Sequence, residues 1–173
     1  MRQSFLLFVA LFFLGLTIRA VYEQLKKARK VDEGDRPVFL VVLAGMIVLW
    51  ASWFAMCPQD PVRLPLPPAV RGAGLALVVL GWVLALGALA QLRGVENIDH
   101  LVTTGLFSQL RHPMYTGFIL WIVGWATFHG AAVSLLPGLL GIVNVLHWRR
   151  LEEEKLESAY GEAYRAYRRS TWF

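Results

Sequence analysis

The sequence is short of the residues that build disulfides, metal centres and soluble surfaces. Its single cysteine, Cys57, excludes a disulfide within the chain, and its four scattered histidines lack the spacing of metal ligands. Charged residues make up only 17% of the chain, and internal repeats and low-complexity tracts are missing. These shortages argue against a disulfide-stabilised domain, a structural metal site and a repeat protein.

Apolar residues are what the chain has in excess. Hydrophobic residues make up 57% of its 173 residues, seven of which are Trp, and its mean hydropathy is positive. Several apolar runs approach the ~20 residues that a helix needs to cross a bilayer. We therefore predict one all-α integral membrane domain over residues 1–173, with five transmembrane helices at about 5–23, 38–56, 70–92, 113–128 and 131–148.

The first apolar run, from Phe5 to Val21, has the position of a secretory signal peptide. Arg19 stands where a small-residue cleavage site would be needed, so we expect this run to be a retained helix. The guanidinium of Arg19 can reach the nearer membrane surface while its aliphatic stem stays in the apolar layer.

Lysine and arginine are distributed unevenly between the two ends of the predicted spans. Thirteen of them fall in the connector at 26–36, the motif segment at 93–112 and the tail at 149–173, against three on the opposite side. The positive-inside rule then places these segments in the cytoplasm and the N-terminus outside, which five spans satisfy. We expect a multi-pass protein of the plasma (inner) membrane. The net charge of +5 is thus a topology signal and poor evidence for nucleic-acid binding.

The fourth and fifth predicted spans are joined by a tight turn at His129 and Gly130. Such a turn forces an antiparallel hairpin, which brings the start of the fourth helix beside the end of the fifth. Arg111 and His112 should therefore lie near the acidic run that begins at Glu152, although the two stretches are far apart in the sequence.

Pro113 is suited to the first position of a helix, because its missing N–H would have no partner there. The next N–H groups point out of the helix end unpaired and carry the partial positive charge of the helix dipole. Arg111 and His112 stand beside that end, so an anion is the expected guest. A charged cap at the entry of a membrane helix is the competing structural interpretation.

Two stretches together resemble a known family. The first reads His100-Leu-Val-Thr-Thr-Gly105 and continues to Arg111-His112-Pro113-Met-Tyr115-Thr-Gly117, and the second carries Glu152-Glu153 and continues to Tyr160-Gly161. This order, with an apolar hairpin between its halves, resembles the integral-membrane methyltransferases of the isoprenylcysteine carboxyl methyltransferase family, which are similar to the phospholipid N-methyltransferases. The resemblance covers residues 75–167.

The resemblance implies S-adenosylmethionine as the methyl donor and no metal. Arg111, His112 and the helix N–H groups would hold the carboxylate of the donor, and Glu152 or Glu153 its ammonium. Tyr115 would flank its adenine or sulfonium. The cofactor-binding set implied in this way is His100, Leu101, Val102, Gly105, Arg111, His112, Pro113, Tyr115, Gly117, Glu152 and Glu153.

Structural roles for these residues remain open as alternatives. His100 can simply cap a polar loop, Tyr115 can belong to an interfacial aromatic belt, and the glutamates can form surface ion pairs with the preceding arginines. Adjacent helix positions differ by roughly 100°, so Glu152, Glu153 and Glu154 cannot all face inward. A helix lying on lipid or against the bundle is the favoured interpretation of the stripe made by Leu156, Tyr160, Tyr164 and Tyr167.

The implied reaction is a direct methyl displacement, in which positioning and water exclusion give most of the acceleration. Because the site opens where two helices meet the bilayer, we predict a lipid-like or prenylated acceptor, with methylation of a carboxylate favoured, at the cytoplasmic face. The predicted catalytic residues are Glu153, Arg165 and Arg168. Glu153 would act as a base for an amine acceptor, and Arg165 or Arg168 would be the cation near a carboxylate acceptor.

Three other functions remain as alternatives to this methyl transfer. The first is N-methylation of a phospholipid amine, the second a membrane reductase of the sterol-reductase type that uses NADPH. The third is a non-enzymatic membrane scaffold whose charged tail binds a partner.

Overall fold

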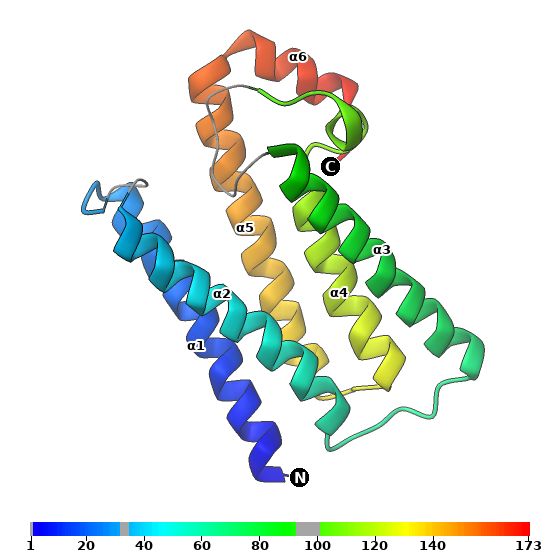
Figure 1. The fold of residues 1–173 in the computed structure, drawn as a ribbon. Coiled ribbons are helices and arrows are strands. Elements are labelled where there is room, and N and C mark those ends of the chain that lie inside the picture. Colours follow the sequence, from blue (N-terminus) through cyan, green and yellow to red (C-terminus); the bar gives the residue numbers. More distant parts are fainter. Residues whose placement is uncertain (1, 32–34, 93–100) are drawn as a thin grey trace.

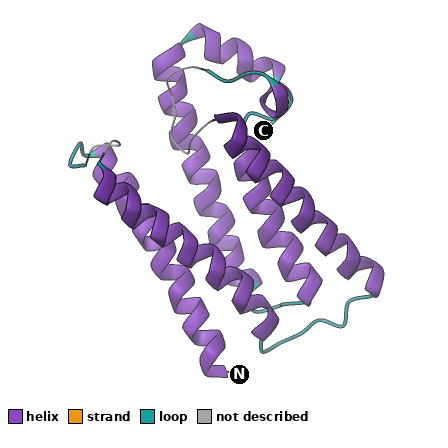
Figure 2. Cartoon of the chain, in the orientation of Figure 1, coloured by secondary structure: helices purple, strands orange, loops and turns teal. Residues whose placement is uncertain are grey.

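The computed structural model describes residues 2–31, 35–92 and 101–173, and these residues fold into helices joined by loops (Figure 2). This confirms the predicted all-α class for the described residues. The α-helices are α1 (Arg2–Lys27), α2 (Arg36–Met56), α3 (Pro68–Leu92), α4 (Pro113–His129), α5 (Leu135–Tyr160) and α6 (Glu162–Ser170). The connections contain two short 3₁₀ helices, η1 (Cys57–Gln59) and η2 (Gly105–Ser108).

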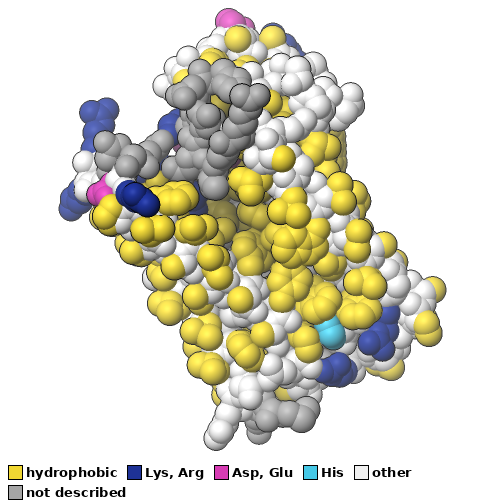
Figure 3. Space-filling model, viewed as in Figure 1, with side chains coloured by type: hydrophobic (Ala, Val, Ile, Leu, Met, Phe, Trp, Pro, Cys, Tyr) yellow, Lys and Arg dark blue, Asp and Glu magenta, His cyan; other side chains and the backbone are white. Residues whose placement is uncertain are grey.

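Three stretches within the described residues are long and apolar enough to cross a membrane. They run over Gln3–Lys27, Arg36–Gln59 and Pro68–Leu92. Hydrophobic side chains cover the broad face over α2 and α3, whereas Lys and Arg gather toward the ends of the molecule (Figure 3). Many large apolar side chains of these helices are exposed, and such a surface is better accommodated by lipid than by water. The chain therefore has the character of a membrane protein.

The helix boundaries follow the expected ones closely at four places and depart from them at the fifth. The ranges expected at 5–23, 38–56, 70–92 and 113–128 lie inside α1, α2, α3 and α4. Gly130 ends α4 in the left-handed conformation, with φ 63°. The fifth helix, α5, begins at Leu135 rather than at 131, and it continues through the acidic run to Tyr160.

Close backbone contact holds the helices together. α1 lies against α2 and α3 against α4, while α5 contacts α4 and α1 (Figure 1). A Cβ added at Gly81 would lie 2.7 Å from the carbonyl oxygen of Gly117, and one added at Gly117 would lie 2.6 Å from that of Gly81. Gly74 and Gly124 face each other in the same way. Small residues thus let α3 and α4 meet at backbone distance, as is usual between membrane helices.

An aromatic cluster joins α2 to the α3–α4 pair. The ring of Trp121 on α4 lies 4.4 Å from that of Trp82 on α3, measured between centroids, and 5.1 and 5.9 Å from those of Trp50 and Phe54 on α2. Such edge and tilted contacts add to the free energy gained by burying large rings. The cluster therefore fixes the distance between the two helix pairs.

A buried carboxylate closes the end of the molecule where η1 follows α2. Asp60 accepts hydrogen bonds from the backbone N–H of Val62 at 2.9 Å and from both the backbone N–H and the hydroxyl of Ser134 at 2.6 Å. Ser134 stands directly before α5. Asp60 thus anchors the loop between α4 and α5 to the end of α2, which accounts for the late start of α5.

Replacing Asp60 by alanine should destabilise the fold by about 2–4 kcal/mol, because the buried donors of Ser134 would lose their acceptor. Thermal unfolding in detergent measures the loss. The matched control is Asp35→Ala, since Asp35 is exposed before α2 and its side chain makes no capping hydrogen bond. Equal unfolding temperatures for the two variants would contradict this role of Asp60.

Candidate active site

The start of α4 and the second half of α5 meet at one corner of the molecule. His112 is buried directly before α4, and its Nε2 lies 3.2 Å from Glu153 Oε1. Arg111 Nε donates to the same oxygen at 3.4 Å. Pro113 occupies the first position of α4, where its missing N–H costs nothing. The packing of α4 on α5 therefore brings together the two halves of the motif, as the sequence predicts.

The charge of Glu153 is stabilised at this corner. The hydrogen bond with His112, followed by the charges of His112, Arg149 and Arg111, lowers the pKa of the Glu153 carboxyl from 4.5 to about 2. Partial burial acts in the opposite direction and is outweighed. Glu153 is therefore ionised at neutral pH.

Glu153→Gln should remove an acid-sensitive part of the folding stability. Because folding lowers the pKa of this carboxyl to about 2, its ionised form contributes stability that is complete above about pH 4.5 and is lost as the pH falls through about 2. Thermal unfolding in detergent at several pH values should show the wild type losing more stability than Glu153→Gln between about pH 5 and pH 2. The exposed-acid control Glu162→Gln should follow the wild type. Parallel curves for Glu153→Gln and the wild type would contradict this assignment.

The C-terminal segment folds back over the motif segment. Arg111 Nη1 donates to the carbonyl oxygens of Arg168 at 3.0 Å and of Thr171 at 2.7 Å. The Tyr167 hydroxyl donates to the carbonyl oxygen of Phe107 at 2.6 Å. Tyr164 and Tyr167 are buried, so this part of the tail's apolar stripe packs against the bundle, while Leu156 and Tyr167 also line the cavity between the helices. No spacing rule in the sequence indicates that Arg111 would take backbone oxygens of the tail.

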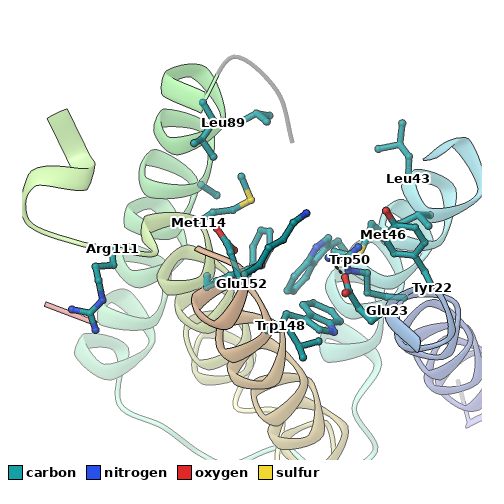
Figure 4. A pocket seen from close by; sticks show the side chains of 18 of the residues that line it. Tyr22, Glu23, Leu43, Met46, Trp50, Leu89, Arg111, Met114, Trp148 and Glu152 are labelled. Atoms are coloured by element: carbon teal, nitrogen blue, oxygen red, sulfur yellow. Dashed lines mark ion pairs between the residues drawn. The ribbon is translucent and has the colours of Figure 1, made fainter. Parts of the chain in front are cut away.

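A cavity of about 1010 Å³ opens between the α1–α2 pair and the helices α3, α4 and α5 (Figure 4). Much of its wall is apolar, with Trp50 and Phe54 of α2, Trp82 of α3 and Phe118 of α4. A volume of this size is at the upper end of the roughly 300–1,000 Å³ that is usual for small-molecule sites.

One end of the cavity is polar. Arg111, Tyr115 and Glu152 line it on the side of α4 and α5, and the Tyr115 hydroxyl approaches the Glu152 carboxylate. Trp148 lies on the same wall, and its indole N–H is buried with no hydrogen-bond partner among the described residues.

The three consecutive glutamates point in different directions. Glu152 and Glu154 line the cavity and Glu153 faces His112, while Glu154 also accepts a hydrogen bond from Arg150 Nε at 3.0 Å in an exposed ion pair. Helical geometry requires such a division, because successive side chains project about 100° apart. Of Glu152 and Glu153, Glu152 is therefore the one that faces the cavity.

The remaining predicted residues fall into three groups. Leu101 and Val102 line the cavity. Gly105 has φ 61° and lies beside the side chain of Gln91, and Gly117 packs on α3. The space left by the missing side chain of each glycine is therefore filled by a neighbouring part of the protein. His100 lies outside the described residues.

Arg165 and Arg168 lie away from the cavity wall. Arg165 donates to Glu157 at 2.7 Å and also pairs with Glu162, and Arg168 reaches Glu157 at 3.4 Å. Both arginines are about half exposed on α6. Their role toward an acceptor carboxylate stays a prediction.

Comparison with known proteins adds a second kind of information. The family model described as phospholipid methyltransferase matches residues 70–163, which span α3, η2, α4 and α5 and thus the whole motif corner. No solved structure matches the chain.

Three curated proteins show the range of similar sequences. A protein-S-isoprenylcysteine O-methyltransferase of Schizosaccharomyces pombe is 38% identical over 43% of this chain and 32% of its own length. One of Rattus norvegicus is 30% identical over 58% of this chain and 39% of its own length. A methanethiol S-methyltransferase of Pseudomonas deceptionensis is 28% identical over 90% of this chain and 68% of its own length. The chain thus spans about a third of the length of the Schizosaccharomyces pombe enzyme and about two-fifths of the length of the Rattus norvegicus enzyme.

Proposed function

The chain belongs to the phospholipid methyltransferase family and is similar to protein-S-isoprenylcysteine O-methyltransferases, and we propose that it is an S-adenosylmethionine-dependent methyltransferase of a membrane. The acceptor we propose is a lipid-like or prenylated molecule that carries a carboxylate. The observation that carries this proposal is the cavity, which is apolar between the helices and polar where Tyr115 and Glu152 stand. A polar methyl donor and an apolar acceptor need such a divided site.

The polar end suits the groups of the methyl donor. Glu152 would accept hydrogen bonds from an ammonium, and the ring faces of Tyr115 and Trp148 would stabilise a cation or stack on a base. Glu153 would hold His112 and Arg111 in place behind this surface. Bound S-adenosylmethionine would supply an electrophilic methyl group, which a carboxylate can attack without a base.

The walls of the cavity would exclude water from the reacting groups. Trp50, Trp82 and Phe118 leave an apolar lining in which a prenyl or acyl chain can replace solvent. Since methyl transfer to a carboxylate needs little covalent help, alignment of the two ligands would supply most of the acceleration.

A thiol is the second candidate acceptor, and one observation favours it. The methanethiol S-methyltransferase match extends over 90% of this chain, so it must include at least part of the α1–α2 side of the cavity wall, which the family model leaves out. The large apolar volume of the cavity favours the longer acceptor over a very small thiol. An amine acceptor and the reductase and scaffold alternatives lack a comparable observation.

The proposal includes five membrane spans, with α4 and the apolar half of α5 crossing as a hairpin and α6 lying at the cytoplasmic face of the plasma membrane. It can be tested in a Cys57→Ser background. A membrane-impermeant maleimide on intact cells should label Arg63→Cys, between α2 and α3, but not Ser158→Cys, near the end of α5. The reverse labelling would contradict this orientation.

Ligand titration tests the activity class. Detergent-solubilised protein should bind S-adenosylhomocysteine, and with S-adenosylmethionine labelled on its methyl group it should transfer label to a farnesylated cysteine that has a free carboxylate. Binding of NADPH instead would support a reductase, and binding of neither would support a scaffold. Transfer to methanethiol but not to the carboxylate would select the thiol acceptor.

A further inference from the structure

The wall of the cavity opposite Tyr115 carries an ion pair on α1. Arg19 Nη2 lies 2.7 Å from Glu23 Oε1, and Lys26 Nζ lies 3.5 Å from Glu23 Oε2. The side chains of Arg19 and Glu23 are only 15% and 7% exposed, and both line the cavity. Figure 4 shows Glu23 and Tyr22 on one side of the cavity and Glu152 and Trp148 on the other.

Packing alone does not explain this pair. Arg19 and Glu23 lie in the stretch Gln3–Lys27, which is apolar enough to cross a membrane. Burying two charges costs desolvation energy that apolar side chains of similar size would not incur. Ionisable residues inside membrane helices therefore tend to serve a ligand or an ion.

The guanidinium of Arg19 is held toward the site. It lies over the ring of Tyr22 at 5.3 Å and over the ring of Trp148 at 5.5 Å, measured to the centroids. Trp148 belongs to α5, so Arg19 bridges the two sides of the cavity's polar end. Tyr115, Arg19 and Glu23 line the same cavity.

The two walls differ in charge. On α1 the cavity is lined by Arg19, Lys26 and Lys27 against the single acid Glu23. On α5 it is lined by Glu152 and Glu154 against Lys155. The α5 wall is thus complementary to the cationic groups of a methyl donor, and the α1 wall is complementary to an anion.

We propose that Arg19 recognises the carboxylate of an amphiphilic acceptor whose apolar chain lies among the aromatic side chains of the cavity. The rings of Tyr22 and Trp148 position the Arg19 guanidinium, so they are positioning residues, whereas Glu23 competes with the acceptor for it. This inference rests on the proposed methyltransferase function and adds to it the residue that selects the acceptor. Arg19 also lies outside the range matched by the family model, so the family resemblance does not point to it.

The test compares two probes that differ only in charge. The probes are an N-acetylated farnesylcysteine with a free α-carboxylate and its neutral carboxamide, and quenching of Trp fluorescence reports their binding to the full chain in nanodiscs. A charge-assisted hydrogen bond predicts that the wild type binds the carboxylate about 10- to 100-fold more tightly than the carboxamide. Arg19→Gln should bring the two affinities to within about threefold of each other.

Two further variants separate recognition from folding. Glu23→Gln removes the acid that competes for Arg19, so it should keep or increase the preference for the carboxylate, even if Arg19→Gln folds poorly. Arg169→Gln removes an exposed cation from α6 and should leave the preference unchanged. A preference that survives Arg19→Gln, that is missing in the wild type, or that is lost in Glu23→Gln would overturn the proposal.

The same samples are titrated with S-adenosylhomocysteine, so that the two proposals fail separately. Binding of S-adenosylhomocysteine together with equal affinities for the two probes would overturn the role of Arg19 and leave the methyltransferase standing. No binding of S-adenosylhomocysteine by the wild type would contradict the proposed function itself, and with it this inference.

Discussion

Glu152→Gln is expected to weaken the binding of S-adenosylhomocysteine by about 10- to 100-fold, the loss that follows from removing one charge-assisted hydrogen bond. The reason is geometric, because Glu152 is the glutamate of the acidic run that both lines the cavity and approaches Tyr115. Isothermal titration of the purified protein in nanodiscs measures the change. Methyl transfer at a fixed donor concentration should fall in parallel.

Glu162→Gln is the matched control for this experiment. Glu162 on α6 is 75% exposed and pairs with Arg165, so its replacement should change the affinity by less than about threefold. Equal losses in Glu152→Gln and Glu162→Gln would mean that the ligand responds to the total negative charge of this end of the molecule. That outcome would contradict the assignment of Glu152 to the donor ammonium.

Gly117→Val should destabilise the protein by at least about 3 kcal/mol and greatly reduce the amount of folded protein in the membrane. A Cβ at this position would meet the carbonyl oxygen of Gly81 at 2.6 Å and Ala85 Cβ at 3.1 Å. Backbone atoms cannot move aside as a flexible side chain does, so α3 and α4 would have to separate. Thermal unfolding and detergent-extractable yield measure the effect.

Gly72→Val in α3 provides the comparison, because an added Cβ there meets nothing within 4 Å. The same change of residue type in a membrane helix should then cost little. Similar losses of yield in the two variants would show that valine is poorly tolerated for reasons other than the contact between α3 and α4.

The meeting of Arg111 and His112 with Glu153 could be predicted from sequence. Two apolar runs joined at His129-Gly130 permit only an antiparallel arrangement, and the order of the motif residues resembles a known family. The lengths and periodicity of the apolar runs were also sufficient to place four of the helices, since an apolar run of membrane length strongly indicates a helix.

The start of α5 could not be predicted, because it depends on Asp60. A carboxylate 74 positions before Ser134 binds the loop and delays the helix, and hydropathy carries no information on such a contact. The same limit applies to Arg111, which bonds to tail carbonyls as well as to Glu153. Tertiary hydrogen bonds of this kind leave no periodic trace in the sequence.

The division of roles among the glutamates illustrates a different limit. Helical geometry predicts that Glu152, Glu153 and Glu154 diverge, but the rotation of α5 about its axis decides which of them meets the cavity. Packing sets that rotation. Hydropathy also does not predict that Arg19 pairs with Glu23 and lies over the rings of Tyr22 and Trp148 on the cavity wall.

A structure determined with S-adenosylhomocysteine bound would show whether this cavity holds the methyl donor. We expect the ligand to lie in the cavity between α1 and α5, with its ammonium at Glu152 and its thioether facing the apolar part. A ligand bound outside this cavity, or on the side of α4 away from Glu152, would contradict this expectation.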